Sequence, residues 1–371
     1  MINAPVCIVS ALRVRYHRFM KQSGKRTTKS LIISIILLCI SAALLIASRN
    51  IGGFAEWYSV NIYSLITGTI GRLAGAVPFS VAEAAACILP FIILADIVHC
   101  RKRLRSAFMH IVLIASVLFF LYAANCGINY HRNTFVDQEA LSSAMFTEDQ
   151  LADFCEYVAG QLEECGSDDS YPQGKKLTDA ARLSMNRLSE NYPSLRGYYP
   201  APKRLSLLSR AFSSMGVSGI YSPFTVEANI NGEMPGMDNP FTACHELSHL
   251  RGFMNEGEAN YIGWLACIGS EDPSFNRSGW LIAWMHAGGV LRKVDPERYE
   301  SLLEKLPPYA VSEIEENRLF WASRETKASE VQDRVNDAYL KANDQKEGIQ
   351  SYGMLTTLML MHYYGQGSPD Q

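Results

Sequence analysis

The most informative stretch of this 371-residue chain is TACHELSHLRGFMNEGEANYIGWLAC, residues 242–267. His245 and His249 are four residues apart in it, which places both imidazoles on one face of a helix. Glu246 lies beside the first histidine. This H-E-x-x-H order is typical of helices that bind zinc through two histidines while the glutamate acts as a general base. The same letters also occur by chance in helices, so the neighbouring sequence has to decide.

The residues around the histidines favour a zinc centre over a chance match. Asn239 and Pro240 predict the helix start, as an N-cap followed by proline at the first helical position. Gly252 predicts its end, so that the chain turns back at once. A second helix is expected over 256–268. Before both helices, residues 216–240 are rich in glycine, β-branched and aromatic residues and predict one or two short strands.

The second helix offers two carboxylates, and only one of them can face the histidines. Glu256 and Glu258 are two residues apart, about 200° around a helix. The residues in phase with Glu256 are small: Ala259, Asn260, Gly263 and Cys267. Those in phase with Glu258 are bulky: Tyr261, Ile262 and Leu265. We therefore predict Glu256 as the third metal ligand, with Glu258 as the alternative, and Asn260 as the partner that orients a ligand.

Three apolar runs precede this region and predict membrane-spanning helices at about 31–48, 76–99 and 107–128. The first run is longer than the apolar core of a signal peptide and two more runs follow it, so it is expected to be an anchor. Glu83 is the acid that stands out within the second run. An ionisable group there is costly and often functional, but Glu83 also lies near the start of its run, where it would reach the interface.

The positive charges predict the orientation of these spans. Residues 1–128 carry 13 of the 34 Lys and Arg residues but only three of the 37 acids. Most of the basic residues lie in the tail 1–29 and in the turn 101–105, which places both in the cytoplasm and residues 129–371 outside it. Membrane topology thus explains the basic clusters without a nucleic-acid partner. Met20 is a plausible alternative to Met1 as the start of translation.

The cysteines do not form a zinc-finger pattern. Cys155 and Cys165 could pair in an oxidising exterior, although no framework spacing supports that pairing. Cys244 and Cys267 fall on apolar helix faces and are expected in the core.

The expected fold is three N-terminal transmembrane α-helices followed by a mainly α (α+β) zincin-like metallopeptidase domain with a small sheet. The tail covers residues 1–29, the membrane domain 30–128 and the catalytic domain 129–371. Thr147 and Gln150 form a capping-box pattern that begins the first outer helix. Further helices are expected at 240–251, 256–268, about 278–293, 297–305, 308–323, 328–342 and 350–364.

HELSH followed by EGEAN resembles the gluzincin pattern H-E-x-x-H…E-x-x-A-[N/D], which falls on Glu256 to Asn260 here. Integral-membrane proteases of the HtpX and CAAX-prenyl type and ImmA-type peptidases share it. The gap between the His pair and the Glu is much shorter here than in HtpX-like enzymes. From about residue 30 to 364 the chain more closely resembles an uncharacterised bacterial family of membrane-anchored, zincin-like proteins, through GIYSPFTVEANIN, HELSHLRGF, EGEAN, YLKAN and SYG. That resemblance implies a fold and a zinc site but no substrate.

The expected chemistry is zinc-assisted hydrolysis of a peptide or protein substrate at the outer face of the cytoplasmic membrane. Zinc on two histidines and Glu256 would activate a water molecule, and Glu246 would take its proton. Tyr352 and Tyr339 are candidate oxyanion donors by residue type and by the resemblance, or else core tyrosines. The stretch 220–231 would be an edge strand that receives the substrate, or an ordinary buried strand.

Two other functions remain open at this stage. A zincin fold could serve a membrane sensor or binding protein that signals through its spans. An intact Glu246 argues against this, since a purely structural zinc site does not need it. A zinc hydrolase of a non-peptide envelope bond is equally compatible with the motif.

Overall fold

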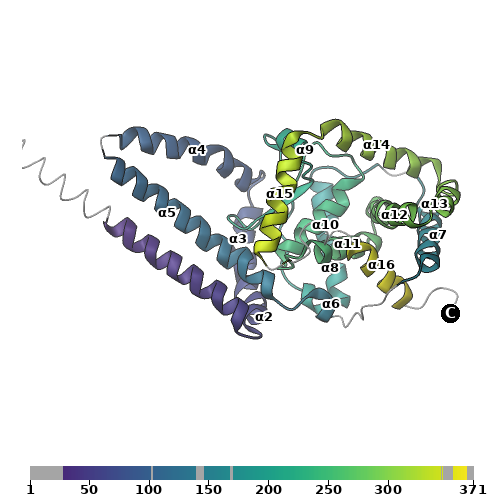
Figure 1. The fold of residues 1–371 in the computed structure, drawn as a ribbon, viewed down its shortest axis with the longest axis horizontal. Helices are drawn as coiled ribbons and strands as arrows, with labels where there is room; N and C mark the ends of the chain where they lie inside the picture. Colours follow the sequence, from purple (N-terminus) through teal and green to yellow (C-terminus); the bar gives the residue numbers. More distant parts are fainter. Residues whose placement is uncertain are drawn as a thin grey trace, which may run out of the picture.

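The computed structural model describes residues 28–101, 103–138, 146–167, 170–343, 345 and 354–365. Three long helices project from one side of a mostly helical body (Figure 1). They are Thr28–Asn50, α4 (Val81–His99) and Leu104–His131, which begins as α5 (Leu104–Tyr122) and continues through a π-helical and a 3₁₀ turn. Each is long and apolar enough to cross a bilayer, as predicted.

The second span begins at Val81 rather than at the predicted residue 76. The Ser80 hydroxyl accepts a hydrogen bond from the Glu83 N–H and so caps the helix at this point. Glu83 itself is buried, and its carboxylate accepts the N–H groups of Ser206 (2.9 Å) and Leu208 (2.8 Å). Glu83 therefore fastens the N-terminal end of α4 to the body.

The chain between the first two spans is helical, although the sequence had indicated only a loop. α2 (Phe54–Tyr58), a π-helical turn (Ser59–Tyr63) and α3 (Ser64–Gly75) follow one another without a break. Tyr58 and Tyr63 are buried in the same hydrophobic core as the helices that follow residue 147. The expected domain boundary at residue 129 falls within the third long helix, Leu104–His131, and residues on both sides of it share one hydrophobic core.

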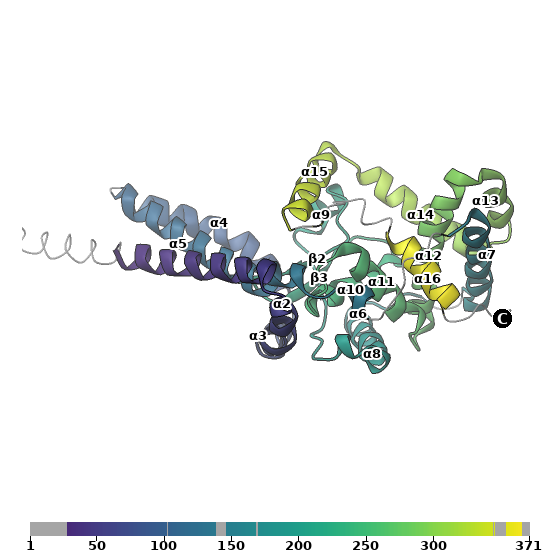
Figure 2. The same cartoon turned by 60° about the horizontal axis from the view of Figure 1, so that its bottom comes forward.

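The body consists of helices that surround a small sheet (Figures 1 and 2). The predicted capping box of Thr147 and Gln150 begins α7, and both of its hydrogen bonds are present. The remaining predicted helices are also found, with ends shifted by a few residues. The helices are α6 (Phe135–Gln138), α7 (Glu148–Cys165), α8 (Lys175–Asn191), α9 (Ser209–Ser214), α10 (Asp238–Leu250), α11 (Glu256–Ile268), α12 (Pro273–Val294), α13 (Pro296–Leu303), α14 (Pro308–Arg324), α15 (Lys327–Ala342) and α16 (Met354–Gly365).

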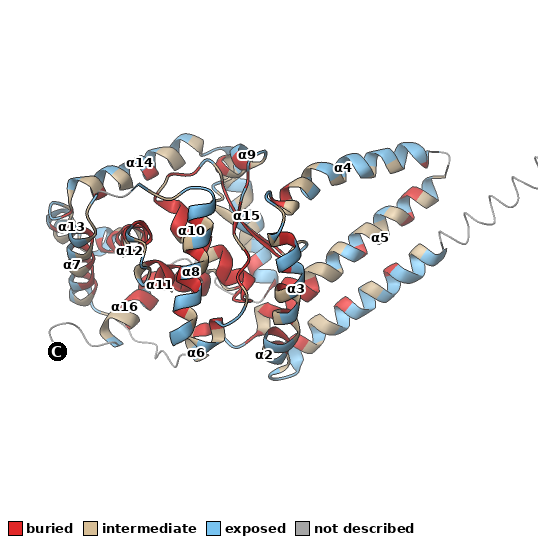
Figure 3. Cartoon of the chain, turned by 180° about the vertical axis from the view of Figure 1, so that it is seen from behind, coloured by how far each residue is buried: buried red, intermediate tan, exposed pale blue. Residues whose placement is uncertain are grey.

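The core is centred on α10, α11 and α12, where the buried residues concentrate, while the spans are largely exposed (Figure 3). Trp264, Trp284 and Phe275 are among its largest fully buried side chains. Each such side chain contributes about 1.5–3 kcal/mol through the removal of apolar surface from water. The helix that carries the two histidines is thus held on several sides, which fixes the directions of its side chains.

The sheet has three short strands in the order β1-β3-β2. β2 (Gly219–Ser222) and β3 (Glu227–Ile230) lie in the stretch where one or two strands were predicted, and they pair antiparallel with Tyr221 opposite Ala228. β1 (Lys203–Arg204) adds to β3 in parallel and was not predicted, because two residues show no alternation. β3 is therefore the central strand and β2 an edge strand.

Candidate metal centre

α10 carries the two histidines and ends where the sequence predicted, but it begins two residues earlier than expected. Its first residue is Asp238. Asn239 is not the cap, because its side-chain amide donates back to the carbonyls of Pro235 (3.4 Å) and Gly236 (3.3 Å). Gly252 has φ 90° and donates its N–H to the His249 carbonyl (2.8 Å). This left-handed residue reverses the chain toward α11.

The structure brings His245, His249 and Glu256 together. His245 Nε2 lies 3.4 Å from Glu256 Oε2, and His249 Nε2 lies 3.8 Å from Glu256 Oε1. One ligand atom from each residue lies within 4.8 Å of the others. His249 Nδ1 donates to the Phe253 carbonyl (2.8 Å), so the lone pair of Nε2 points into the cluster.

Close packing of α11 on α10 makes this meeting possible. A Cβ at Gly263 would lie 3.1 Å from the His245 backbone nitrogen, so a larger residue would push the helices apart. Asn255 caps α11 by accepting the N–H of Glu258 (3.1 Å), and this fixes its first turn. Glu256 is the first residue of that turn and faces α10. The small face predicted for α11 is thus the face that packs on the histidine helix.

Glu258, the alternative third ligand, points elsewhere. Its carboxylate accepts the backbone N–H groups of Phe135 (2.5 Å) and Val136 (3.3 Å) at the start of α6. Burial raises its pKa to about 7, even though these hydrogen bonds favour the charged form. Glu258 therefore links α11 to the segment that follows the third span, and it does not join the histidines.

Glu246 is buried beside this cluster, and one of its oxygens lacks a partner. Within the described part of the chain, Oε2 makes no hydrogen bond. Burial, together with the charge of Glu256, raises the pKa of Glu246 to about 8, while His245 opposes the shift. β2 lies directly against the carboxylate, since a Cβ at Gly219 would come 2.5 Å from Glu246 Oε1. In the sequence, only a glycine near a predicted strand hints at this contact.

The electrostatics of the three clustered residues suit a cation. Burial lowers the pKa of His249 to about 4, so its imidazole is neutral at pH 7 and free to act as a ligand. For His245 the effect of burial is outweighed by Glu256 and Glu246, and the pKa is raised. Asn260 contributes to that rise because its side chain lies beside the His245 ring. For Glu256 the two histidines outweigh burial and lower the pKa.

The donor set fits zinc. Two imidazole nitrogens and one carboxylate form a three-ligand set used by catalytic zinc sites, which keep a fourth position open. Glu246 Oε2 is buried and makes no hydrogen bond among the described residues. His245, His249 and Glu256 would hold the ion, and Glu246 would remain outside its coordination.

Most of the chain, residues 58–360, matches a family model described as "Protein of unknown function (DUF3810)". The chain belongs to the DUF3810 family. The matched region runs from the last residue of α2 into α16, so it includes two of the spans and the whole candidate centre. No curated protein and no solved structure matches the chain.

The tyrosines proposed as oxyanion donors are not shown in that role in this DUF3810 protein. The Tyr339 hydroxyl lies 3.5 Å from Cys126 Sγ, and its ring packs edge-on against Tyr122 and Tyr130. Tyr339 thus contacts side chains at the end of the third long helix, Leu104–His131. Tyr352 lies outside the described residues, as do Met1 and Met20.

The four cysteines of the DUF3810 chain that follow the third long helix are free thiols: Cys155, Cys165, Cys244 and Cys267. Cys155 is buried on α7, while Cys165, at the end of the same helix, contacts Asn276 Oδ1 (3.2 Å). The suggested Cys155–Cys165 disulfide is therefore absent. Cys244 and Cys267 are fully buried side by side in the core, as predicted.

Proposed function

We propose that this chain is a membrane-anchored, zinc-dependent peptidase with a zincin-like centre that hydrolyses peptide bonds at the outer face of the cytoplasmic membrane. One observation carries the proposal: His245, His249 and Glu256 converge on one point while Glu246 lies beside them with an unpartnered oxygen. A structural zinc site would need the three ligands and a fourth, but no free carboxylate.

The residues of this chain divide the work between them. Zinc, when bound, would polarise the peptide carbonyl and acidify the attacking water. Glu246 takes the proton of that water and passes it to the nitrogen of the leaving amine. The hydrogen bond from His249 to the Phe253 carbonyl keeps Nδ1 protonated and Nε2 aimed at the centre. Asn260 is the proposed partner that orients His245, whose buried Nδ1 makes no hydrogen bond among the described residues.

The edge strand β2 is the proposed docking place for an extended substrate. It is the outer strand of the sheet, and its Gly219 lies against Glu246. Ile220 and the nearby Phe224 are exposed and offer apolar contacts beside the strand. Main-chain pairing with β2 would place a peptide alongside the centre. Only the first part of the stretch 220–231 takes this role, because β3 is paired on both sides.

The proposed topology rests on the charge of the α4–α5 turn. The α4–α5 turn, with Arg101, Arg103 and Arg105, lies at the end of the spans that is far from the body (Figure 1). Positive turns are retained in the cytoplasm, so the body, with its candidate centre, lies on the opposite side. The bilayer is then the partner of the exposed apolar spans. The basic residues that flank the spans are explained by this topology, so we propose no nucleic-acid partner.

The test uses the full-length chain in lipid nanodiscs, with zinc content and cleavage of a peptide library measured together. Wild type is expected to bind zinc and cleave, whereas Glu246→Gln should bind zinc equally and cleave roughly 10²–10⁴-fold more slowly. Glu190→Gln, an exposed carboxylate on α8, is the matched control and should behave as wild type. Unchanged cleavage in Glu246→Gln contradicts the proposal. Zinc binding without cleavage in any variant would instead favour a sensor or a non-peptide hydrolase.

A further inference from the structure

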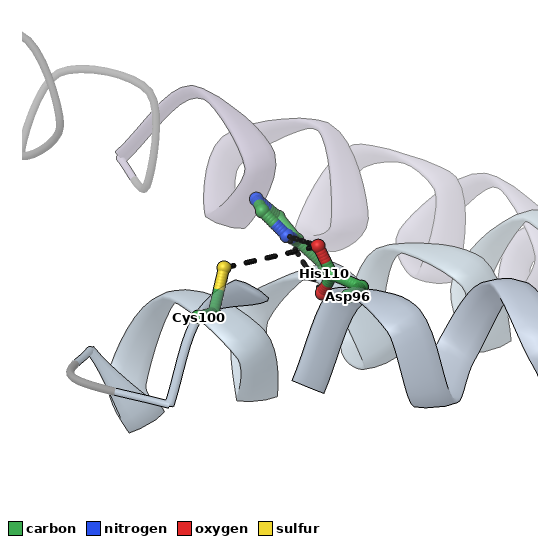
Figure 4. A group of neighbouring side chains, drawn as sticks. All are labelled: Asp96, Cys100 and His110. Carbon is green, nitrogen blue, oxygen red and sulfur yellow. Dashed lines mark hydrogen bonds and ion pairs between the residues drawn. The ribbon is translucent and has the colours of Figure 1, made fainter. Parts of the chain in front are cut away.

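A second cluster of possible metal ligands lies at the far end of the spans, distant from the body. Asp96 and Cys100 belong to the end of α4, and His110 belongs to α5. Their side chains point toward one another between the two helices (Figure 4). One ligand atom from each lies within 4.8 Å of the others. None of these three residues takes part in the proposed peptidase centre.

The local sequence explains why these residues meet. Asp96 and Cys100 are four apart, so they share one face of α4 at its last turn. Cys100 ends the helix and donates its backbone N–H to the Asp96 carbonyl (2.8 Å). A short turn then reverses the chain, and His110 follows in the second turn of α5. Asp96 and His110 are therefore brought face to face (Figure 4).

The distances are close to those of a coordinated ion. His110 Nδ1 lies 3.0 Å from both oxygens of Asp96, and Cys100 Sγ lies 3.8 Å from Asp96 Oδ1. Ligands around tetrahedral zinc are roughly 3.4–3.6 Å apart, given its usual bond lengths. Shifts of a few tenths of an ångström would therefore bring the two Asp96 contacts to this ligand spacing. The Cys100 thiol donates a long hydrogen bond to the carboxylate that His110 also contacts, so all three side chains converge on Asp96.

We propose that Asp96, Cys100 and His110 form a second, exchangeable site for a zinc-class divalent cation. Carboxylate, thiolate and imidazole are the ligand types that zinc uses, and the two anionic groups balance its charge. Binding displaces the Cys100 thiol proton to solvent. The His110 and Asp96 side chains keep exposed fractions of 36% and 29%, so a fourth position stays open to exchange.

Such a site cross-links the helical hairpin at its closed end. Only Glu83 of α4 is buried, so this span makes few packing contacts of its own. At its other end α4 is held by Glu227 of β3, which accepts the N–H groups of Val81 (3.1 Å) and Ala82 (2.8 Å). A cation bound at Asp96 fixes the end of α4 that the body does not hold.

Cobalt distinguishes this site from the proposed peptidase centre. Cobalt bound to thiolate gives an intense near-ultraviolet charge-transfer band, and the centre of His245, His249 and Glu256 contains no cysteine. The full-length chain, without a histidine tag and freed of metal by chelation, is titrated with Co²⁺ in detergent. We expect two equivalents to bind and the charge-transfer band to develop with one of them.

Variants assign the band to its ligands. Cys100→Ser should lose the band and one equivalent, and Asp96→Asn and His110→Ala should weaken the same equivalent at least tenfold. Cys87→Ser, on the same helix, and Cys126→Ser, near Glu256, should keep it. His249→Ala should lose the other equivalent and retain the band, so the two sites fail independently. Helical circular dichroism identifies any variant that does not fold, and the other two ligand variants then decide.

Two results would overturn the second site. One is a wild-type chain that binds cobalt without a thiolate band. The other is a band that survives Cys100→Ser but disappears in Cys126→Ser, which would assign the thiolate to the neighbourhood of Glu256.

Discussion

The two ligand clusters of this chain share one plan. On α10, His245 and His249 are four residues apart and the third group, Glu256, comes from the next helix. On α4, Asp96 and Cys100 have the same spacing, and His110 comes from the next helix. Two donors on one helix face and a third after a turn are thus enough to build a three-donor cluster.

The surroundings of the two clusters differ, and this difference separates a proposed catalytic centre from a proposed exchange site. α10 and α11 are packed so closely that no Cβ fits freely at Gly263, and Glu246 and an edge strand adjoin the donors. In α4 only Glu83 is buried, and no carboxylate beyond Asp96 joins the cluster among the described residues. Hydrolysis needs the base and the docking strand as well as the ion.

The largest expected effect is from His249→Ala, which removes one donor from the cluster of His245, His249 and Glu256 and none from the cluster at Asp96. Zinc at this centre and peptide cleavage should both fall to background, because the two remaining donors leave the ion weakly held. The thiolate band of cobalt at Cys100 should be unchanged. His286→Ala, on α12, is the matched control. Zinc content and cleavage equal to wild type in His249→Ala would contradict the proposed centre of His245, His249 and Glu256.

The next prediction compares the two neighbouring glutamates. Loss of a residue that only hydrogen-bonds to a metal ligand typically weakens metal binding roughly 10–100-fold. Glu256→Ala should weaken zinc binding by more than this, since it deletes a ligand. Glu258→Ala should keep the zinc affinity but lower the free energy of unfolding by about 1–3 kcal/mol, because the N–H groups of Phe135 and Val136 lose their acceptor. Chelator competition and chemical denaturation measure the two effects. A reversal of the pattern would make Glu258 the ligand.

Gly219→Ala tests whether β2 adjoins the base. The new methyl group would meet Glu246 Oε1 at 2.5 Å and Thr242 Cγ2 at 2.7 Å, so strand or carboxylate must move. Cleavage should fall roughly 100-fold, as for an ångström-scale misplacement, with zinc content unchanged. Gly160→Ala on α7, where nothing lies within 4 Å, is the control. Full activity in Gly219→Ala would separate β2 from the reaction.

A smaller effect is expected from Asp238, at the start of the histidine helix. Burial raises its pKa from 3.8 to about 6, although Trp321 and Asn317 donate to it. The folded state therefore holds this proton more tightly than the unfolded state. Its contribution to the free energy of unfolding is present at low pH and falls, by at most about 3 kcal/mol, as the pH rises through this interval.

Asp238→Asn checks that sign in metal-free protein, where zinc loss at low pH plays no part. Wild type should lose more stability than Asp238→Asn between pH 4 and pH 7. Parallel curves for the two proteins would mean that Asp238 does not titrate in this range.

Features that depend on local spacing could be predicted from the sequence. The four-residue interval fixed the face shared by His245 and His249, and the small residues in phase with Glu256 indicated which carboxylate would turn toward them. The capping box at Thr147 located the start of α7 for the same reason. Helix periodicity and caps act over a few residues, so a single sequence contains them in full.

Features that depend on distant contacts could not be predicted. Glu83 is bonded to Ser206, 123 residues away, and only that contact shows why an acid begins a span. β1 exists because β3 offers it an edge, since its two residues have no pattern of their own. The cluster of Asp96, Cys100 and His110 was missed because no motif comparable to H-E-x-x-H marks these residues in the sequence.

The most direct test of the centre formed by His245, His249 and Glu256 is zinc-edge X-ray absorption on the full-length Cys100→Ser chain. This substitution leaves that centre as the only proposed zinc site. We predict a coordination shell of two imidazoles with oxygen donors at about 2.0–2.2 Å and no sulfur. A shell that contains sulfur at about 2.3 Å, or one without imidazole, would contradict the assignment of His245, His249 and Glu256.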